Sequence, residues 1–256
     1  MVNMQTEFSQ LAQVIHDKCT RGPFYYICNP GNWGEGLIRQ GTLKFFHDIG
    51  FHYFELPLRK RGVLRLVEHY LPLILRGTLI YGGGGAWCNL WDGSVQRMTR
   101  IATSYQQVIV LPSTYEKRVD FTNITFFSRD RFESMQVVPE AKFCHDMAFY
   151  FERQTAGKGT GEGYFFRVDK ESSGKPPISP ENVDISRQGK YLTPIGPFFD
   201  AIDRYQVIYT DRLHVAIAAC LLKKELHLYP GAYFKNKAVY RSSMLGFYDN
   251  IHFHDL

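Results

Sequence analysis

The chain has 256 residues, of which 45% are hydrophobic, so it is long enough to bury a sizeable core as one large domain or two small ones. Lys and Arg outnumber Asp and Glu by 30 to 25, and the basic residues are scattered, with Arg59-Lys60-Arg61 as the longest basic run. That balance suits a small anionic substrate and argues against a nucleic-acid partner.

The cysteines and the apolar runs indicate the compartment. The five cysteines are odd in number, far apart and mostly placed among apolar residues, which argues against a disulfide framework and indicates buried thiols in a reducing compartment. Residues 1–13 lack a basic region followed by an apolar stretch, and no apolar run approaches the roughly 20 residues that a spanning helix requires. We therefore expect a cytoplasmic protein with no transmembrane segment, which leaves room for peripheral contact with a membrane-bound substrate.

In the first half of the chain, short β-rich runs alternate with amphipathic segments, which is the pattern of strands connected by helices in a mostly parallel sheet. In chain order we expect a strand at 24–28, a helix from 37 to a stop at Gly50, a strand at 53–56, a helix at 63–75, a strand at 79–81, a helix at 95–105, and strands at 108–111 and 124–127.

Residues 153–161 are polar and rich in glycine, as is typical of a linker, so we expect a domain boundary there. The expected domains are an N-terminal Rossmann-like domain, 1–152, and a smaller C-terminal one with a terminal helix, 153–256. The second contains expected strands at 164–168, 207–209 and 226–229, an exposed loop at 172–182, and helices at 213–222 and 237–247. The predicted fold class is α/β, with two facing Rossmann-like domains.

Two glycine-rich motifs follow expected strands. Gly31-Asn32-Trp33-Gly34-Glu35-Gly36 precedes a helix, where glycine lets a ligand approach the backbone and the helix N-terminus favours anions. A tight strand-to-helix turn explains its glycines equally well. Gly82-Gly83-Gly84-Gly85 follows a strand at the end that lines ligand crevices in parallel sheets. From these motifs we expect ligand contacts at Asn32, Gly34, Glu35, Gly83 and Gly84.

Two arginines are expected at the carboxyl ends of strands, in Ser128-Arg129-Asp130 and in Thr210-Asp211-Arg212-Leu213-His214. Arginine offers a planar fork for carboxylate or phosphate, and the adjacent Asp would orient it or cap the following helix. For either motif alone, a structural Arg-Asp ion pair is the better interpretation. His214 opens a helix with apolar spacing, so a packed structural role stands beside one in proton transfer.

Metal chemistry has little support in the sequence, because it contains no Asp-x-Asp motif and no C-x-x-C spacing. His252-Phe253-His254-Asp255 lies at the tail, where a frayed or packed terminus is expected. We therefore predict no metal site and no resident cofactor.

Taken in order, these motifs resemble the polysaccharide pyruvyl transferase family over most of the chain. The matching residues are Gly31-Asn32-x-Gly34-Glu35, Gly82 to Gly85, Ser128-Arg129-Asp130 with Ser134, Asp146-Met147-Ala148, Arg167-x-Asp169-x-Glu171, Thr210-Asp211-Arg212-Leu213-His214, and Tyr233-x-Lys235-Asn236 with Val239-Tyr240. Each match is weak alone, and the ordered set is fairly specific. Two departures are that Glu35 stands where the family often has Asp, and that the chain is shorter than many members.

The resemblance implies a fold similar to that of B-type glycosyltransferases, with phosphoenolpyruvate as donor substrate in the cleft. It implies transfer of the pyruvyl group onto two hydroxyls of a sugar in an exopolysaccharide or capsule precursor, forming a cyclic ketal. A lipid-linked oligosaccharide is an acceptor that the family leads us to expect. Arg129 would come from the first domain, and Arg212 with His214 from the second. The further substrate-binding residues that it implies are Ser128, Asp130, Asp211, Leu213, Lys235 and Asn236.

Phosphoenolpyruvate carries a carboxylate and a phosphate on one small frame, so its site needs several fixed cationic donors, a need that Arg129 and Arg212 fit. His214 would either protonate the methylene carbon or act as base toward the acceptor hydroxyl, and the sequence leaves both roles open. Two other functions stay open as well. One is a B-type glycosyltransferase that uses a nucleotide sugar, and the other is a non-catalytic carbohydrate-binding protein.

Overall fold

The computed structural model describes residues 4–56, 76–155, 157, 159–174 and 179–255. The chain divides into two compact units. We call residues 4–30 with 42–147 the N-terminal unit, and residues 31–41 with 148–255 the C-terminal unit. Each contains one parallel sheet, so the α/β class is confirmed, and a facing arrangement of the B-type glycosyltransferase kind stays a prediction.

A single linker at 153–161 was expected, but the described chain crosses between the two units at three places. The chain passes into the C-terminal unit at Gly31, returns after Gly41 and passes again after Met147. The expected helix at 63–75 and the basic run at 59–61 lie outside the described residues.

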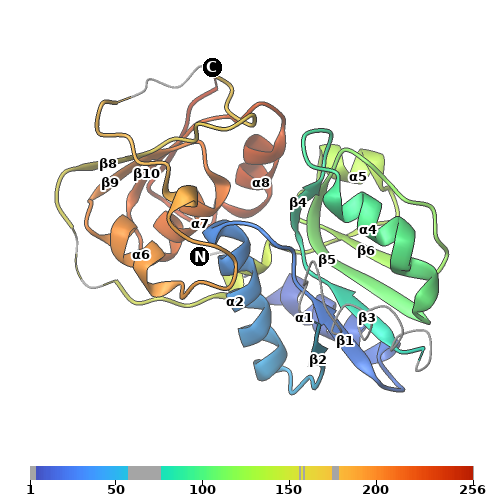
Figure 1. Ribbon diagram of the computed structural model, residues 1–256. Coiled ribbons are helices and arrows are strands. Elements are labelled where there is room, and N and C mark those ends of the chain that lie inside the picture. Colours follow the sequence, from blue (N-terminus) through green and yellow to red (C-terminus); the bar gives the residue numbers. More distant parts are fainter. Residues whose placement is uncertain (1–3, 57–75, 156, 158, 175–178, 256) are drawn as a thin grey trace. The chain divides into compact units, whose positions relative to one another are not determined.

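The N-terminal unit is built on a seven-stranded parallel sheet with the order β2-β1-β3-β5-β6-β7, in which β4 also pairs with β5 (Figure 1). Helix α4 packs against β4, and α5 packs against β5. The strands are β1 (Phe24–Ile27), β2 (Phe54–Glu55), β3 (Thr78–Tyr81), β4 (Gly84–Trp87), β5 (Gln107–Tyr115), β6 (Ile124–Ser128) and β7 (Lys142–Phe143). The helices are α1 (Gln5–Lys18), the second half of α2 (Trp33–Asp48), α4 (Gly93–Ile101), the 3-10 turn η1 (Ala102–Ser104) and α5 (Glu133–Val137). The 3-10 turn η2 (Met147–Tyr150) lies where the chain passes into the C-terminal unit.

Aromatic side chains fill the core of this unit. Trp87, at the end of β4, is fully buried and makes edge-on contacts with Tyr81, Tyr115 and Phe126, at ring-centroid distances of 6.3, 5.5 and 6.0 Å. β3 is buried along its whole length and β5 along all but its first residue, as central strands of a parallel sheet are. The apolar runs expected to be strands at 79–81 and 108–111 are these two central strands.

The glycines at 82 and 83 are explained by neighbouring backbone segments, which lie too close to leave room for a side chain. A Cβ on Gly83 would lie 2.3 Å from the carbonyl oxygen of Pro112, and one on Gly82 would lie 3.0 Å from the amide nitrogen of Asn29. The Asn29 amide donates to the carbonyls of Gly82 and Gly83, at 2.9 and 2.7 Å. Gly84, with φ of 126°, opens β4. The second half of the tract is therefore a strand, which the sequence analysis did not anticipate.

The C-terminal unit is built on a four-stranded parallel sheet with the order β11-β10-β9-β8. Helix α7 is buried on nearly every side, because it packs against β9, β10 and α6. The strands are β8 (Glu162–Phe165), β9 (Val207–Thr210), β10 (Glu225–Leu228) and β11 (Ile251–Phe253). The helices are the first half of α2, η3 (Ile185–Arg187), α6 (Gly196–Asp203), α7 (Leu213–Leu221) and α8 (Lys235–Ser243).

Three details of the expected pattern are settled. Gly50 follows α2 with φ of 65°, so the expected glycine stop is confirmed. The tail was expected to be frayed or packed, and residues 251–253 are not frayed, because they form strand β11, which pairs with β10. The five cysteines lie in the described residues and carry thiols; four are buried, and burial raises the pKa of the half-buried Cys19 to about 12. No helix within the described ranges is both long and apolar enough to cross a membrane.

We expect Gly83→Ala to lower the free energy of unfolding by roughly 1–3 kcal/mol, the usual cost of overpacking, because the new methyl group would meet the Pro112 carbonyl. Gly93→Ala is the matched control, since the space around its Cβ is open and alanine favours a helix over glycine by roughly 0.5–1 kcal/mol. Chemical denaturation followed by circular dichroism measures both. A Gly83→Ala protein as stable as the wild type would contradict the close backbone approach.

Candidate functional site

The polar residues singled out in the sequence gather at the carboxyl ends of the strands, where parallel sheets usually bind ligands. We call the set in the N-terminal unit the Arg129 cluster and the set in the C-terminal unit the C-terminal cluster. The Arg129 cluster consists of Thr114, Ser128, Arg129, Asp130, Ser134 and Asp146. The C-terminal cluster consists of Arg167, Asp169, Glu171, Asp184, Asp211, Arg212, His214, Lys235 and Asn236.

Arg129 is completely buried directly after β6. Its Nε donates to the Thr114 hydroxyl at 2.7 Å, and its Nη1 donates to Asp146 at 2.6 Å, in an ion pair whose side chains are each 1% exposed. This is the structural Arg-Asp pair that the sequence left open, with Asp146 as partner in place of the adjacent Asp130. In this arrangement the guanidinium of Arg129 is hydrogen-bonded to Thr114 and Asp146. A catalytic role for Arg129 stays a prediction.

Asp130 caps the short helix α5. Its carboxylate accepts hydrogen bonds from the backbone amides of Phe132 and Ser134, at 3.2 and 3.1 Å, and from the Ser134 hydroxyl. The Ser128 hydroxyl donates to the carbonyl of Asp130 at 2.6 Å. Burial raises the pKa of Asp130. The motif thus forms an internally hydrogen-bonded turn.

Asn32 and Glu35 cap α2 in a similar way. The Asn32 side chain accepts from the amide of Gly34 at 2.7 Å, and the Glu35 carboxylate reaches back to accept from the amide of Asn32 at 3.1 Å. This reciprocal pattern is a capping box, which satisfies backbone donors at a helix N-terminus. The tight turn, one of the two interpretations of this motif, is present, and ligand binding by Asn32 or Glu35 stays a prediction.

His214 lies against Gly34. A Cβ on Gly34 would come within 2.4 Å of His214 Nδ1, so only glycine leaves room for the imidazole. Gly34 is the second residue of α2 and His214 the second residue of α7. The N-termini of two helices, of 16 and 9 residues, therefore meet at one imidazole. Helix N-termini carry partial positive charge and favour anions.

Two arginines, one of them directly before α7, share one carboxylate. Arg167 donates to Asp169 through Nε and Nη2, at 2.8 and 3.1 Å. Arg212, at the start of α7, donates through Nη2 to Asp169 at 3.1 Å, and the same nitrogen lies 2.6 Å from Asp184. Asp184 was not among the residues singled out in the sequence, because a lone acidic residue shortly after a loop gives no periodic signal.

Lys235, the first residue of α8, extends the network. Its Nζ donates to Glu171 at 2.5 Å, and the same carboxylate oxygen accepts from Arg167. Burial alone would raise the pKa of Glu171, but the charges of Lys235 and Arg167 lower it to about 2. Burial would likewise raise the pKa of Asp169, and the hydrogen bond from Arg167 lowers it to about 2. Both carboxylates are therefore ionised at neutral pH.

Asp211 behaves differently. It is fully buried, and Oδ1 accepts from the amide of Arg167 at 2.8 Å, while Oδ2 has no hydrogen-bond partner among the described residues. Burial raises the pKa of Asp211 to about 6, in spite of the hydrogen bond from Arg167 and the charge of Arg212. Buried carboxyls with raised pKa values are common where proteins handle protons.

Two further buried atoms in the C-terminal cluster lack a partner within the described part of the chain, namely Arg212 Nε and Asn236 Oδ1. The Asn236 amide nitrogen donates to the carbonyls of Asp211 and Tyr229, at 2.6 and 2.9 Å, so the side chain is held in place. Leu213 is buried between Arg212 and His214 in the chain. Buried polar atoms are usually paired, so donors and acceptors left over at a strand end indicate a place for a ligand.

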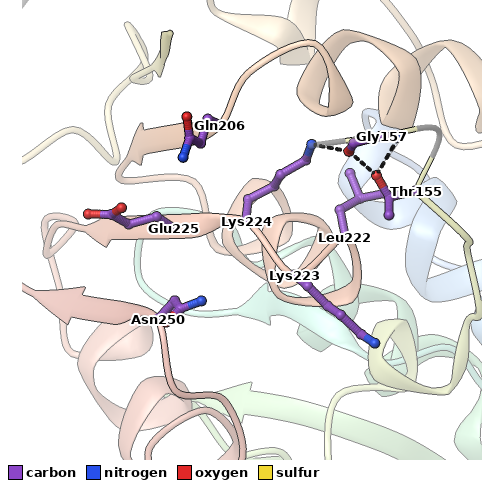
Figure 2. A pocket seen from close by; sticks show the side chains of 8 residues that line it. All are labelled: Thr155, Gly157, Gln206, Leu222, Lys223, Lys224, Glu225 and Asn250. Atoms are coloured by element: carbon purple, nitrogen blue, oxygen red, sulfur yellow. Dashed lines mark hydrogen bonds between the residues drawn. The ribbon is translucent and has the colours of Figure 1, made fainter. Parts of the chain in front are cut away.

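A hollow of about 470 Å³ lies at the opposite, amino-terminal edge of the same sheet (Figure 2). Its buried cation, Lys224, is bound by the protein, since Nζ donates to the carbonyls of Gly157 and Asp203 and pairs with the Asp203 carboxylate at 2.7 Å. The hollow is lined by Thr155, Gly157, Gln206, Leu222, Lys223, Lys224, Glu225 and Asn250. It contains none of the residues singled out in the sequence.

Comparison with known proteins supports the architecture. No family model and no curated protein matches the sequence. The structure is similar to the crystal structure of a functionally uncharacterised protein from Klebsiella pneumoniae, with a TM-score of 0.74, 26% sequence identity and complete coverage of both chains. This similarity bears on the fold and carries no information about function.

The raised pKa of Asp211 predicts a pH-dependent stability. Between about pH 4 and pH 6 the folded protein binds this proton more tightly than the unfolded chain does. We expect the wild type to gain up to about 3 kcal/mol relative to Asp211→Asn as the pH falls from about 7 to about 4. Denaturation curves at several pH values measure the difference, with Asp200→Asn, whose side chain is 60% exposed, as control. A constant difference between Asp211→Asn and wild type would contradict the shift.

Proposed function

We propose that the protein is a transferase that moves the pyruvyl group of phosphoenolpyruvate onto a sugar as a cyclic ketal, with the C-terminal cluster as its donor site. The observation that carries the proposal is the contact between His214 and Gly34, because it puts an imidazole, a side chain suited to proton transfer, where the N-termini of α2 and α7 meet. Both motifs belong to the ordered set that resembles the polysaccharide pyruvyl transferase family.

The charges around this point suit a small, doubly anionic donor. The partial positive charge of the two helix N-termini favours the phosphate, and Arg212 supplies the cation nearest to His214 in the chain. Its Nε is a buried donor without a partner among the described residues, and we assign it to the donor carboxylate. Arg212 also pairs with carboxylates, through Nη2 alone. Arg167 donates to carboxylates through all three of its guanidinium nitrogens and Lys235 pairs with Glu171, so we assign these two cations the role of positioning the loops around the site.

The partly protonated Asp211 reduces the repulsion that an incoming anion would meet. A negative charge brought nearby would raise the pKa of Asp211 further, and because that pKa is already about 6, the change would favour the neutral carboxylic acid near neutral pH. Asp211 is next to Arg212 in the chain, and its carbonyl accepts from Asn236. Binding of phosphoenolpyruvate would therefore be accompanied by proton uptake near neutral pH.

The reaction needs one proton donor and one proton acceptor. In the proposed sequence His214 gives a proton to the methylene carbon of phosphoenolpyruvate, which makes the central carbon electrophilic. One sugar hydroxyl adds to that carbon, and its proton returns to the imidazole. The bond to phosphate then breaks, and a second hydroxyl adds to close the ketal while its proton leaves with phosphate. General acid–base catalysis of this kind contributes roughly 10²–10⁴-fold to a rate.

Binding of the donor tests the site without knowledge of the acceptor. We expect phosphoenolpyruvate to bind saturably to the wild type in calorimetric titration, and roughly 10–100-fold more weakly to Arg212→Lys, which keeps the charge but loses the planar fork. Arg153→Lys is the control, since Arg153 pairs with the exposed Asp200 and lies over the ring of Phe199, and none of its described contacts involves the C-terminal cluster. Binding of a nucleoside diphosphate in place of phosphoenolpyruvate would favour a nucleotide-sugar glycosyltransferase. Binding of sugars alone would favour a non-catalytic carbohydrate-binding protein.

Turnover tests the role of His214. We expect His214→Gln to retain phosphoenolpyruvate binding and to lose roughly 10²–10⁴-fold in phosphate release with a mixture of acceptor oligosaccharides. His47→Gln, with a side chain that is 87% exposed in the wild type, should keep full activity. Near wild-type turnover in His214→Gln, with the fold intact by circular dichroism, excludes the imidazole as both acid and base.

A further inference from the structure

One face of the C-terminal sheet carries a row of rings. Residues along β8, β9 and β10 alternate between buried positions and more exposed ones, as the two-residue period of a strand requires. On the more exposed face, Tyr164, Tyr209, His227 and His252 come from four successive strands. The parallel register places each directly opposite the next.

Neighbouring rings of this row stack. The ring centroids are 5.0 Å apart for Tyr164 and Tyr209, 4.4 Å for Tyr209 and His227, and 4.8 Å for His227 and His252, with interplanar angles of 15°, 13° and 26°. His227 therefore has a ring on each side, which fixes the plane of its imidazole. Its two ring nitrogens lie within that plane, so the directions in which they can form a hydrogen bond or bind an ion are fixed as well.

Glu225 lies on the same face, two residues before His227. Its Oε1 is 3.4 Å from His227 Nε2 and 3.7 Å from His252 Nε2. One ligand atom from each of the three side chains lies within 4.8 Å of the other two. Glu225 also lines the hollow at the amino-terminal edge of the sheet, where Figure 2 shows its carboxylate directed away from Lys224. The Glu225 side chain is 43% exposed, so an ion in solution can reach it.

The other nitrogen of His227 is held by a fourth side chain. His227 Nδ1 and His254 Nε2 form a hydrogen bond of 2.9 Å, and His254 is stacked on Tyr229 at 4.3 Å. When His227 carries its proton on Nδ1, Nε2 directs its lone pair toward Glu225. Metal-binding histidines almost always have their second ring nitrogen hydrogen-bonded in this manner, because that bond fixes the tautomer and the ring orientation.

We propose that Glu225, His227 and His252 bind a divalent first-row transition-metal ion, with Zn²⁺ as the best fit. Two imidazoles and a carboxylate suit zinc, whereas calcium and magnesium prefer oxygen ligands alone. Zinc lies about 2.0–2.2 Å from such ligands, so the three atoms need only small rotations of the exposed Glu225 and His252 side chains to converge on one ion. Three protein ligands leave a fourth position for water or another ligand. This site shares no residue with the C-terminal cluster.

The test uses the full chain without an affinity tag and ZnCl₂ as the titrant. We expect one equivalent of Zn²⁺ to bind to the wild type in calorimetric titration, and Co²⁺ to give the visible absorption of a protein-bound ion of low coordination number. His252→Gln should weaken binding by more than about 100-fold, and loss of the hydrogen-bonded neighbour in His254→Gln by roughly 10–100-fold. Glu225→Gln provides a second ligand variant, and circular dichroism checks that each variant folds.

His47→Gln is the matched control, because His47 is another surface histidine 3.2 Å from a carboxylate, that of Asp48. It should bind Zn²⁺ as the wild type does. Equal Zn²⁺ affinity in the wild type and His252→Gln, or loss of binding in His47→Gln, would overturn the proposal and indicate adventitious surface binding. An absence of saturable binding to the wild type would overturn it as well.

Discussion

A buried network of charges positions the candidate site in the C-terminal unit. Arg167, Asp169 and Glu171 come from the segment after β8, while Arg212 and Lys235 stand at the starts of α7 and α8. Removing an ion from water costs several kcal/mol unless a partner compensates it, so these segments are held to one arrangement. The start of α7 is fixed by Arg212, and His214 is thereby held against the glycine turn that begins α2. The proposed donor binding depends on that placement.

Similar sequence motifs lead to different results in the two units. After β6, the side chains of Arg129 and Asp130 bind groups of their own unit, and the outcome is a well-capped turn. After β9, the pair Asp211 and Arg212 leaves buried atoms without partners among the described residues, beside a histidine at two helix N-termini. The difference lies in the partners that distant segments supply. A local motif therefore indicates where a site can be, and the surrounding fold decides whether one forms.

The sequence predicted the elements whose signal is local. Short apolar runs predicted β3, β5 and β9, because the burial of a strand is visible in its own residues. Gly50 predicted the end of α2, because glycine readily adopts the positive φ found there. It missed β4, because glycine has low strand propensity, and β11, because an apolar-poor tail becomes a strand only when it pairs with β10. The contact between Gly34 and His214 and the alignment of His227 with His252 depend on topology and register. No spacing rule within one segment reveals them.

Residues 31–41 belong to the C-terminal unit, so the ribosome makes them long before the rest of that unit. Trp33 is buried in that unit, where its Nε1 donates to the carbonyl of Pro194 at 3.2 Å and its ring packs 5.9 Å from that of Phe198. Ribosomes add roughly 5–20 residues per second, so Trp33 emerges well before its partners exist. Its apolar ring must remain in water or in a chaperone until then. Cleavage at a single peptide bond after Met147 would likewise separate Trp33 from the unit that it completes, so the two units are not separable as consecutive fragments of the gene product.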